Sequence, residues 1–340
     1  MSATALAISA VERTPIPDPV TRGGVAFLVA RARGELGKDA MSDAAFAADM
    51  TRYPIATDTA DANAQHYEVP TEFFRLCLGP RLKYSSCLYD ASTPNLAAAE
   101  DLALAESCAH ADLQDGQAVL ELGCGWGSLS LWMAEHYPAS RITSVSNSNS
   151  QRESIEATAA ARGLTNLTVI TADMNDFATE ARFDRMVSVE MFEHMSNWRG
   201  LLERVKGWLK PDGRAFLHVF SHRDHPYRFD AEDPDDWIAK YFFTGGIMPS
   251  HRLIRAFPDL FEVEDEWRWS GAHYQRTAND WLVNFDRHRD RIDAILRPVY
   301  GADTDVWKRR WRLFFLATAG LFGDRGGETW GVSHYRLKPA

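Results

Sequence analysis

Residues 119–127, which read Val-Leu-Glu-Leu-Gly-Cys-Gly-Trp-Gly, constrain the fold more than any other stretch of the chain. Glycines stand at alternate positions, as Gly123, Gly125 and Gly127. They follow a short apolar run, and a helical pattern over 129–136 comes after them. Because glycine tolerates positive φ and lets a ligand approach the backbone, the segment predicts a strand, a tight turn and a helix N-terminus. An α/β sheet binds nucleotide-like ligands at such a point.

The chemistry around the glycines restricts the kind of ligand. Their spacing is not the G-x-G-x-x-G of dinucleotide-binding folds, and no Gly-Lys-Ser/Thr phosphate loop follows. Glu121 stands just before the glycines and would repel a phosphate anion. A cationic or zwitterionic ligand, such as the sulfonium and amino acid group of S-adenosylmethionine (SAM), suits this carboxylate better.

Strands and helices alternate through the middle of the chain, which predicts an α/β fold. Five short strands are expected at 118–122, 141–146, 167–171, 183–189 and 214–220. With helices between them, this order indicates a parallel sheet with right-handed crossovers. Two more strands, and two long helices before the last of them, are expected at 261–268, 330–337, 276–297 and 305–322.

The remaining segments predict the domain organisation. Residues 1–20 contain three prolines and little periodicity, which is typical of a mobile arm. Residues 24–50 are rich in alanine and predict one or two helices, and 57–64 has the composition of a linker. Residues 221–260 are rich in Asp, His and Pro, and we expect them to form an insertion over the ligand edge of the sheet.

Composition excludes several classes of function. With 340 residues, the chain can bury a sizeable core in one large or two smaller domains, and its net charge of −10 argues against a nucleic acid partner. We expect no signal peptide, because the N-terminus lacks a basic segment followed by a long apolar run. We expect no integral membrane span, because no apolar stretch of about 18 residues occurs. The four cysteines form no C-x-x-C pair, so we expect a cytoplasmic protein. The oligomeric state stays open, a homodimer included.

Several separated motifs resemble one enzyme family. The order of elements with the glycine turn resembles class I SAM-dependent methyltransferases. The segments 66–74 (His-Tyr-Glu-Val-Pro-Thr-Glu-Phe-Phe) and 82–85 (Leu-Lys-Tyr-Ser) look like the N-terminal region of the cyclopropane fatty acid synthase superfamily. The segments 187–195, 236–246 and 328–335 look more specifically like its coclaurine N-methyltransferase branch.

This resemblance covers roughly residues 60–340. It implies a Rossmann-like, seven-stranded α/β domain over 66–340, preceded by an N-terminal arm and helical extension over 1–65. The insertion at 221–260 is then a helical cap. The implied activity is methyl transfer from SAM.

The resemblance also assigns the cofactor site. It implies that Gly123 and Gly125 pass beneath the methionine part of SAM, and that Tyr84 and Ser85 close over it. Glu121, at the end of the first strand, belongs to the same site.

The nucleoside half of the cofactor follows from the next two strands. No acidic residue ends the second strand, and in this superfamily an Asn/Ser-x-x-Gln segment replaces it, so Asn147 and Gln151 are expected to bind the ribose hydroxyls. The less favoured alternative is a polar turn that caps the next helix, since Ser and Asn suit that role. Asp173 follows the third strand, where class I methyltransferases usually hold the adenine amino group, so the resemblance implies this role for Asp173, with Met174 against the ring; the alternative is a plain turn residue.

A carboxylate-rich cluster after the fourth strand predicts the chemistry. An amine acceptor must be neutral to attack the methyl group, so a base should remove its proton. Glu190, Glu193 and His194 end the fourth strand, and 190 and 194 share one face if a helical turn starts there. Their pKa values in a dry pocket suit proton removal near neutrality, and the family's N-methyltransferases imply base roles at these positions.

Cyclopropane synthases are the main alternative, with a lipid alkene as acceptor and bicarbonate as base. The chain keeps three residues of their pattern, Glu193, His218 and Tyr274. It has Ser86 where they have Cys, and Glu190 where they usually have Gly. A second carboxylate would repel bicarbonate, so Glu190 favours a small cationic amine as substrate over a lipid.

Two further groups of residues are candidates for binding. His218 and Tyr274 are expected to contact the substrate. Aromatic residues of the cap and the last strand are expected either to form a box for an amine or to pack in the lid core, namely Trp237, Tyr241, Phe242, Phe243 and Trp330. We expect no metal site at His218, His222, Asp224 and His225, because their spacing crosses a strand end and a loop.

Overall fold

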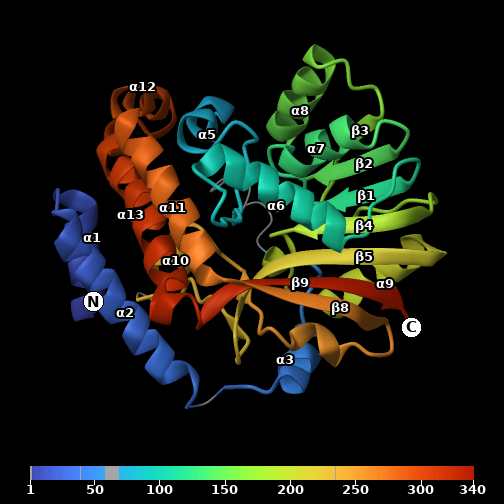
Figure 1. Cartoon of the computed structure of the whole chain (residues 1–340). Coiled ribbons are helices and arrows are strands. Elements are labelled where there is room, and N and C mark those ends of the chain that lie inside the picture. Colours follow the sequence, from blue (N-terminus) through green and yellow to red (C-terminus); the bar gives the residue numbers. More distant parts are fainter. Residues whose placement is uncertain (1, 39, 58–68, 234) are drawn as a thin grey trace.

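A seven-stranded sheet with the order β3-β2-β1-β4-β5-β9-β8 forms the centre of the molecule (Figure 1). The computed structural model describes residues 2–38, 40–57, 69–233 and 235–340. The strands are β1 (Ala118–Leu122), β2 (Arg141–Ser146), β3 (Leu167–Thr171), β4 (Phe183–Val189), β5 (Leu209–His222), β8 (Phe261–Ser270) and β9 (Trp330–Pro339). The first five are parallel, and β9 runs antiparallel to both β5 and β8. The predicted seven-stranded α/β fold is confirmed.

The strands β1 to β4 have the bounds that the sequence predicted. β5 is longer than the strand predicted at 214–220, because it begins at Leu209 and ends at His222. This extension lies next to a register shift between Phe183 and Arg185 of β4. The parallel part of the sheet is therefore regular, and the irregularity lies at the end away from the glycine turn.

Helices cover both faces of the sheet. On one face, α6 (Leu96–His110) and α7 (Ser128–His136) pack on side chains such as Val119 and Phe216. On the other face, α9 (Trp198–Trp208), α3 (Asp43–Met50) and the 3₁₀ turn η2 (Leu253–Ala256) pack on Leu120 and Leu217. The alternation of consecutive residues between two cores follows from the pleat of a strand, and it is typical of a doubly covered parallel sheet. Helix α8 (Asn149–Ala161) packs beside β3.

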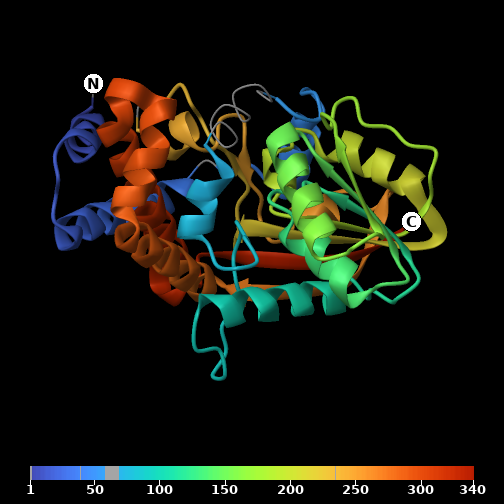
Figure 2. The ribbon, with the colours of Figure 1, turned by 90° about the horizontal axis from the view of Figure 1, so that it is seen from above.

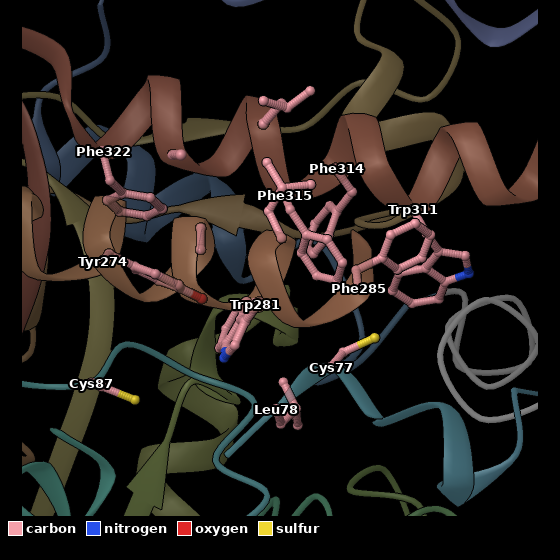
Figure 3. Packing of buried hydrophobic residues seen from close by; sticks show 14 of the residues in the cluster. Cys77, Leu78, Cys87, Tyr274, Trp281, Phe285, Trp311, Phe314, Phe315 and Phe322 are labelled. Atoms are coloured by element: carbon pink, nitrogen blue, oxygen red, sulfur yellow. The ribbon is translucent and has the colours of Figure 1, made fainter. Parts of the chain in front are cut away.

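A helical bundle lies beside the sheet (Figures 1 and 2). Its long helices are α11 (Gly271–Arg287), α12 (Arg289–Tyr300) and α13 (Thr304–Phe322), and α5 (Thr71–Cys77) packs against the first two. The bundle has an aromatic core that includes Trp281, Phe285, Trp311, Phe314 and Phe315 (Figure 3). Within the described ranges, no helix is long and apolar enough to cross a membrane.

The single helix predicted over 276–297 is wrong, because the chain breaks at His288 into α11 and α12. His288 has φ −106° and ψ 17°, and its ring contacts the carbonyl of Leu76 through Nδ1 at 3.0 Å. The break lets both helices pack against α5. A periodic pattern that continues across the break gives no sign of this tertiary contact.

The N-terminal residues form helices instead of the predicted mobile arm. They are α1 (Ala3–Arg13) and α2 (Asp18–Leu36), and both pack against α13. Glu12 of α1 is buried and accepts hydrogen bonds from Trp237 Nε1 (2.9 Å) and Arg310 Nε (2.8 Å). Except for Thr57, the linker expected over 57–64 lies outside the described residues, and so does the domain boundary at 65/66.

Among its described residues, the insertion at 221–260 contains one short α-helix. Its elements are α10 (Trp237–Tyr241), the paired strands β6 (Tyr227–Arg228) and β7 (Ile247–Met248), and η2. The longer helices of the cap come from the segment between β8 and β9. The remaining 3₁₀ turns are η1 (Phe192–His194), η3 (Gly301–Asp303) and η4 (Asp324–Gly326).

Candidate active site

A cavity of about 190 Å³ lies at the carboxyl ends of the parallel strands. Residues that follow β1, β2, β3 and β4 line it, together with residues from α11 and α13 of the bundle. This is the edge at which open α/β sheets bind their ligands, because the loops after parallel strands meet there. The sheet and the bundle thus share one site.

The three glycines of the turn after β1 have different roles. All have positive φ, at +78° for Gly123, +51° for Gly125 and +82° for Gly127. A Cβ atom at Gly123 or Gly127 would collide with the side chains of Met191 (2.4 Å) or Ile155 (2.5 Å). At Gly125, which lines the cavity, a Cβ atom would have no neighbour within 4 Å. Gly125 therefore leaves space for a ligand, and the other two glycines make the close packing around it feasible.

All residues predicted for the cofactor line this cavity. They are Tyr84, Ser85, Glu121, Gly123, Gly125, Asn147, Gln151, Asp173 and Met174. Several of their side chains are held in place by neighbours, as when Gln151 Oε1 accepts a hydrogen bond from Ser146 (2.6 Å) and Asp173 Oδ1 accepts one from the backbone of Asn175 (2.8 Å). The assignment of each contact to a part of the cofactor stays a prediction.

Glu121 is a buried carboxyl that lines this cavity. Its Oε2 accepts hydrogen bonds from Ser144 (2.7 Å) and from Ser130. Burial raises the pKa of Glu121 to about 7. A cationic ligand in the cavity would favour its ionised form. The buried carboxyl, the space at Gly125 and the polar groups after β2 and β3 fit a ligand with a cationic amino acid part and a nucleoside.

Glu190 has an unusual backbone and a well-ordered carboxylate. Its φ is +47°, a left-handed conformation that side chains other than glycine rarely adopt. Its Oε1 accepts hydrogen bonds from the Ser86 N–H (2.9 Å) and contacts His218 Nε2 at 3.2 Å, and its Oε2 accepts one from the Tyr274 hydroxyl (2.7 Å). Burial raises the pKa of Glu190, while nearby Lys83, the Ser86 N–H and Tyr274 oppose that rise. The conformation explains why glycine can occupy this position in related proteins, as the resemblance implies.

The other two predicted catalytic residues lie differently. His194 lines the cavity and stacks on Phe243, with ring centroids 4.9 Å apart and planes at 9°. Glu193 is fully buried and is not part of the cavity wall; its Oε1 accepts a hydrogen bond from the Phe220 N–H (2.5 Å). Its Oε2 makes no hydrogen bond with any described residue. Burial, and then the neighbouring Glu190 carboxyl, raise the pKa of Glu193 well above its usual range.

The structure corrects the predicted aromatic box. Tyr241, Phe242 and Trp330 lie in the helical packing and not on the cavity wall: Tyr241 accepts a hydrogen bond from Arg310 (3.0 Å), Phe242 stacks on Phe314, and Trp330 donates to Tyr227 (3.1 Å). These side chains pack the cap against the sheet and the bundle.

Other aromatic residues form the wall instead, and the sequence reasoning found only some of them. Phe243, a member of the proposed box, lines the cavity, as does Tyr274. Phe220 and Phe314 also line it and were not predicted. Phe220 is the last residue of an expected strand, so its place at the ligand edge could have been predicted. Nothing in the local pattern of α13 distinguishes Phe314.

Lys83 is a further cavity residue that the sequence reasoning missed. It is only 2% exposed, and its Nζ donates to Ser85 Oγ and to the Ser86 carbonyl, both at 2.6 Å. Burial lowers its pKa. Its place beside Tyr84 and Ser85 in the Leu-Lys-Tyr-Ser motif was the available signal.

The histidines around β5 have hydrogen-bond partners within the protein. Among the described residues, no group of three or more His, Cys, Asp or Glu side chains is arranged to hold a metal ion. His222 Nδ1 instead accepts hydrogen bonds from the backbone N–H groups of Asp224 and His225. His218 lies behind the cavity wall and contacts Glu190.

This fold, with its glycine turn and its cavity at the carboxyl ends of the strands, defines a class I SAM-dependent methyltransferase. The model of the mycolic acid cyclopropane synthetase family matches residues 56–329. The chain belongs to this family.

Individual relatives include enzymes with different acceptors. The chain is 36% identical over 294 residues to (S)-coclaurine N-methyltransferase of Thalictrum flavum subsp. glaucum, which covers 85% of this chain and 81% of that protein. It is 31% identical over 270 residues to the cyclopropane-fatty-acyl-phospholipid synthase of Escherichia coli (strain K12), which covers 79% of this chain and 66% of that protein.

Solved structures agree with this placement. A crystal structure of coclaurine N-methyltransferase bound to N-methylheliamine and SAH superposes with a TM-score of 0.94, at 32% identity, over 99% of this chain and 100% of that one. The cyclopropane synthase MmaA2 of Mycobacterium tuberculosis shares the fold, with a TM-score of 0.69 at 21% identity over 84% of this chain and 99% of that one. The enzyme class and the use of SAM are thus established by both the site and the relatives.

Proposed function

We propose that this enzyme methylates the nitrogen of a small amine. When bound, SAM supplies a methyl group on a positively charged sulfur, which a neutral amine can attack in line. The residues that bind both reactants line one cavity. The similarity to N-methyltransferases supports a nitrogen acceptor.

The observation that carries this proposal is the position of the Glu190 carboxylate. The family resemblance implies that cyclopropane synthases hold bicarbonate with groups that include a histidine of the fifth strand and a tyrosine before the long helix. Here His218 and Tyr274 contact Glu190 instead. The enzyme therefore carries its own carboxylate where the synthases use a bound anion. A fixed negative charge suits a cationic amine and excludes bicarbonate.

Glu190 and Glu193 are adjacent buried carboxyls, and we assign them different protonation states. Glu190 receives three polar contacts, whereas Glu193 has one bonded oxygen and one without a partner among the described residues. Two adjacent buried carboxyls do not both ionise readily. Glu190 is therefore the ionised member and the base that accepts the amine proton, and Glu193 holds a proton. This differs from the base role first predicted for Glu193.

His194 and the aromatic wall complete the acceptor side of the cavity. Because the His194 ring is stacked on Phe243, it faces the acceptor in a fixed orientation. The aromatic faces of Phe243, Tyr274 and Phe314 favour a cation and its methylated product.

All four cysteines are buried and unbridged, which is compatible with the reducing cytoplasm.

A direct test compares two classes of acceptor. The purified protein is incubated with SAM labelled in its methyl group, and either a panel of primary and secondary cyclic or aryl-alkyl amines or vesicles of unsaturated phospholipid. We expect label in the amine fraction, with mass spectrometry showing the methyl group on nitrogen. Label found only in lipid would overturn the proposal and favour a cyclopropane synthase.

A further inference from the structure

A chain of three histidines connects Glu190 to the surface of the protein. Glu190 Oε1 lies 3.2 Å from His218 Nε2, and His218 Nδ1 lies 2.8 Å from His334 Nε2. His334 Nδ1 in turn lies 2.8 Å from His110 Nδ1. The chain ends at Glu106, whose Oε2 is 3.4 Å from His110 Nε2. Both nitrogens of His218 and His334 thus have a hydrogen-bond partner, whereas His110 Nε2 pairs with Glu106 only when the ring is protonated.

Three separate elements place these rings in line. His218 on β5 and His334 on β9 are paired directly across the sheet, and His110 is the last residue of α6. The first two rings are fully buried, and the side chain of Glu106 is 43% exposed. His110 stacks on Trp267, with centroids 3.8 Å apart and planes at 6°. The chain therefore runs from the active site to the surface through a rigid aromatic environment.

The hydrogen bonds along the three histidines must all run in the same direction. Burial lowers the pKa values of His218 and His334 well below the usual range and also lowers that of His110, so each neutral ring has one N–H donor and one acceptor nitrogen. The hydrogens can all point toward Glu190 or all point away from it. An ionised carboxylate only accepts hydrogen bonds, and the three neutral rings have too few N–H groups to donate to both Glu190 and Glu106. The side chain of Glu106 is 43% exposed and can accept hydrogen bonds from water, whereas that of Glu190 is only 8% exposed, so Glu190 requires the first arrangement. His218 and His334 then donate from Nε2, and His110 donates from Nδ1.

We propose that His110 and His334 are positioning residues for Glu190, because they hold His218 in the tautomer that donates to the carboxylate. The role of a ring nitrogen is set by the hydrogen bond that the other nitrogen makes. Without its neighbours, His218 can adopt the tautomer whose Nε2 lone pair faces Glu190. The ionised base then loses a donor. This inference rests on the proposed role of Glu190.

Other charged groups surround the chain and do not replace this effect. Lys83, Glu193 and Tyr274 act on Glu190 from other elements. At the surface end, Arg336 and Asp265 act on His110 together with Glu106. None of these groups contacts His218 Nδ1, whose hydrogen bond is made with His334. Breaking the chain of three histidines should therefore raise the pKa of Glu190, while Lys83, Glu193 and Tyr274 keep their effects on it.

The test measures how kcat/KM for amine methylation depends on pH in two variants of His110. His110→Phe keeps a ring on Trp267 but has no nitrogen, so we expect the rising limb of the profile to move upward by about 1 pH unit, with the plateau at high pH retained. His110→Asn places an N–H where Nδ1 donates to His334, so its profile should stay at the wild-type position. His136→Phe is the matched control, since His136 stacks on Trp132 in a similar way (3.9 Å, 19°) outside the chain.

A second measurement does not depend on activity. In protein labelled with ¹⁵N-histidine, nitrogen NMR at alkaline pH should show protonation of His110 on Nδ1 and of His218 and His334 on Nε2. Any other set of tautomers overturns the proposal, as do equal shifts in both His110 variants or none in His110→Phe. If the wild-type protein methylates no amine, the proposed function fails, and the NMR result still decides whether the chain of three histidines exists.

Discussion

Glu190 shows how much a single residue can decide. It holds a left-handed backbone conformation, which costs a side chain other than glycine about 1–2 kcal/mol. The contacts from Ser86, His218 and Tyr274 offset this strain by fixing the carboxylate. Strained residues that persist in this way are concentrated at functional sites. The conformation and the contacts together support a chemical role for this side chain.

Replacing Glu190 by glycine should convert the site into one that needs an added anion. Glu190→Gly suits the backbone and leaves Ser86, His218 and Tyr274 facing an empty space. We expect amine methylation to fall by about 10²-fold or more, because the base is lost. Formate or bicarbonate should restore part of the activity by filling that space, as measured with labelled SAM over a series of anion concentrations.

Glu190→Gln is the control for this experiment. It also lacks the base, but its amide fills the space, so anions should not restore its activity. Equal rescue of both variants, or full activity of Glu190→Gly without an anion, would contradict the role given to Glu190.

At the scale of the elements, some helices and strands could be predicted from local sequence patterns, whereas others depend on contacts with distant parts of the chain. The bounds of β1 to β4 could be predicted because each is a short run with β-branched and apolar residues between turn signals. The helix α1 could not be predicted in this way, because its anchor, Glu12, depends on Trp237 and Arg310 from distant parts of the chain. The break at His288 has the same cause, since its partner Leu76 belongs to α5.

The anchoring of α1 is open to a test of stability. Glu12→Ala leaves the Trp237 N–H and the Arg310 guanidinium without their buried acceptor, so we expect a loss of about 1–3 kcal/mol and faster cleavage of α1 by protease. Urea unfolding and limited proteolysis measure both effects. Arg13→Ala, at an exposed position of the same helix, should change neither. Unchanged proteolysis of Glu12→Ala would show that α1 is held by other contacts.

At the scale of the whole molecule, one cavity depends on two packed parts. The sheet supplies the glycine turn and the carboxyl cluster, whereas the bundle supplies Tyr274 and Phe314. The site therefore places ionisable side chains inside the hydrophobic core that the sheet and the bundle share. Such groups reduce stability at the pH at which they must ionise.

Glu121 should make the stability of the whole protein depend on pH. Burial raises its pKa from 4.5 to about 7, so the folded chain binds more protons than the unfolded chain between these values. The free energy of unfolding should therefore fall as pH rises from 4.5 to 7, by about 2–3 kcal/mol from this group. Glu121→Gln should remove that part of the dependence, as measured by urea unfolding at pH values on both sides of this range.

Glu262→Gln, at an exposed position of β8, is the matched control and should keep the wild-type dependence. If Glu121→Gln had the same pH dependence as the wild-type protein, Glu121 would not be the carboxyl that titrates in this range.

The sequence by itself determined the fold class, the bounds of the parallel strands and the position of the cofactor turn at Gly123, Gly125 and Gly127. These features depend on hydrophobic patterns and backbone conformations that are local to each segment. Only the tertiary structure decided which side chains form the cavity wall, because that depends on how the bundle packs on the sheet.

The tertiary structure also decided the state of the carboxyl cluster. Sequence proximity grouped Glu190, Glu193 and His194, but the turn exposes only Glu190 and His194 to the cavity and buries Glu193 behind it. The contacts of Glu190 come from positions 86, 218 and 274, far apart in the chain. A local pattern can identify residues capable of the chemistry, but their ionisation and orientation depend on contacts that form only when distant segments pack together.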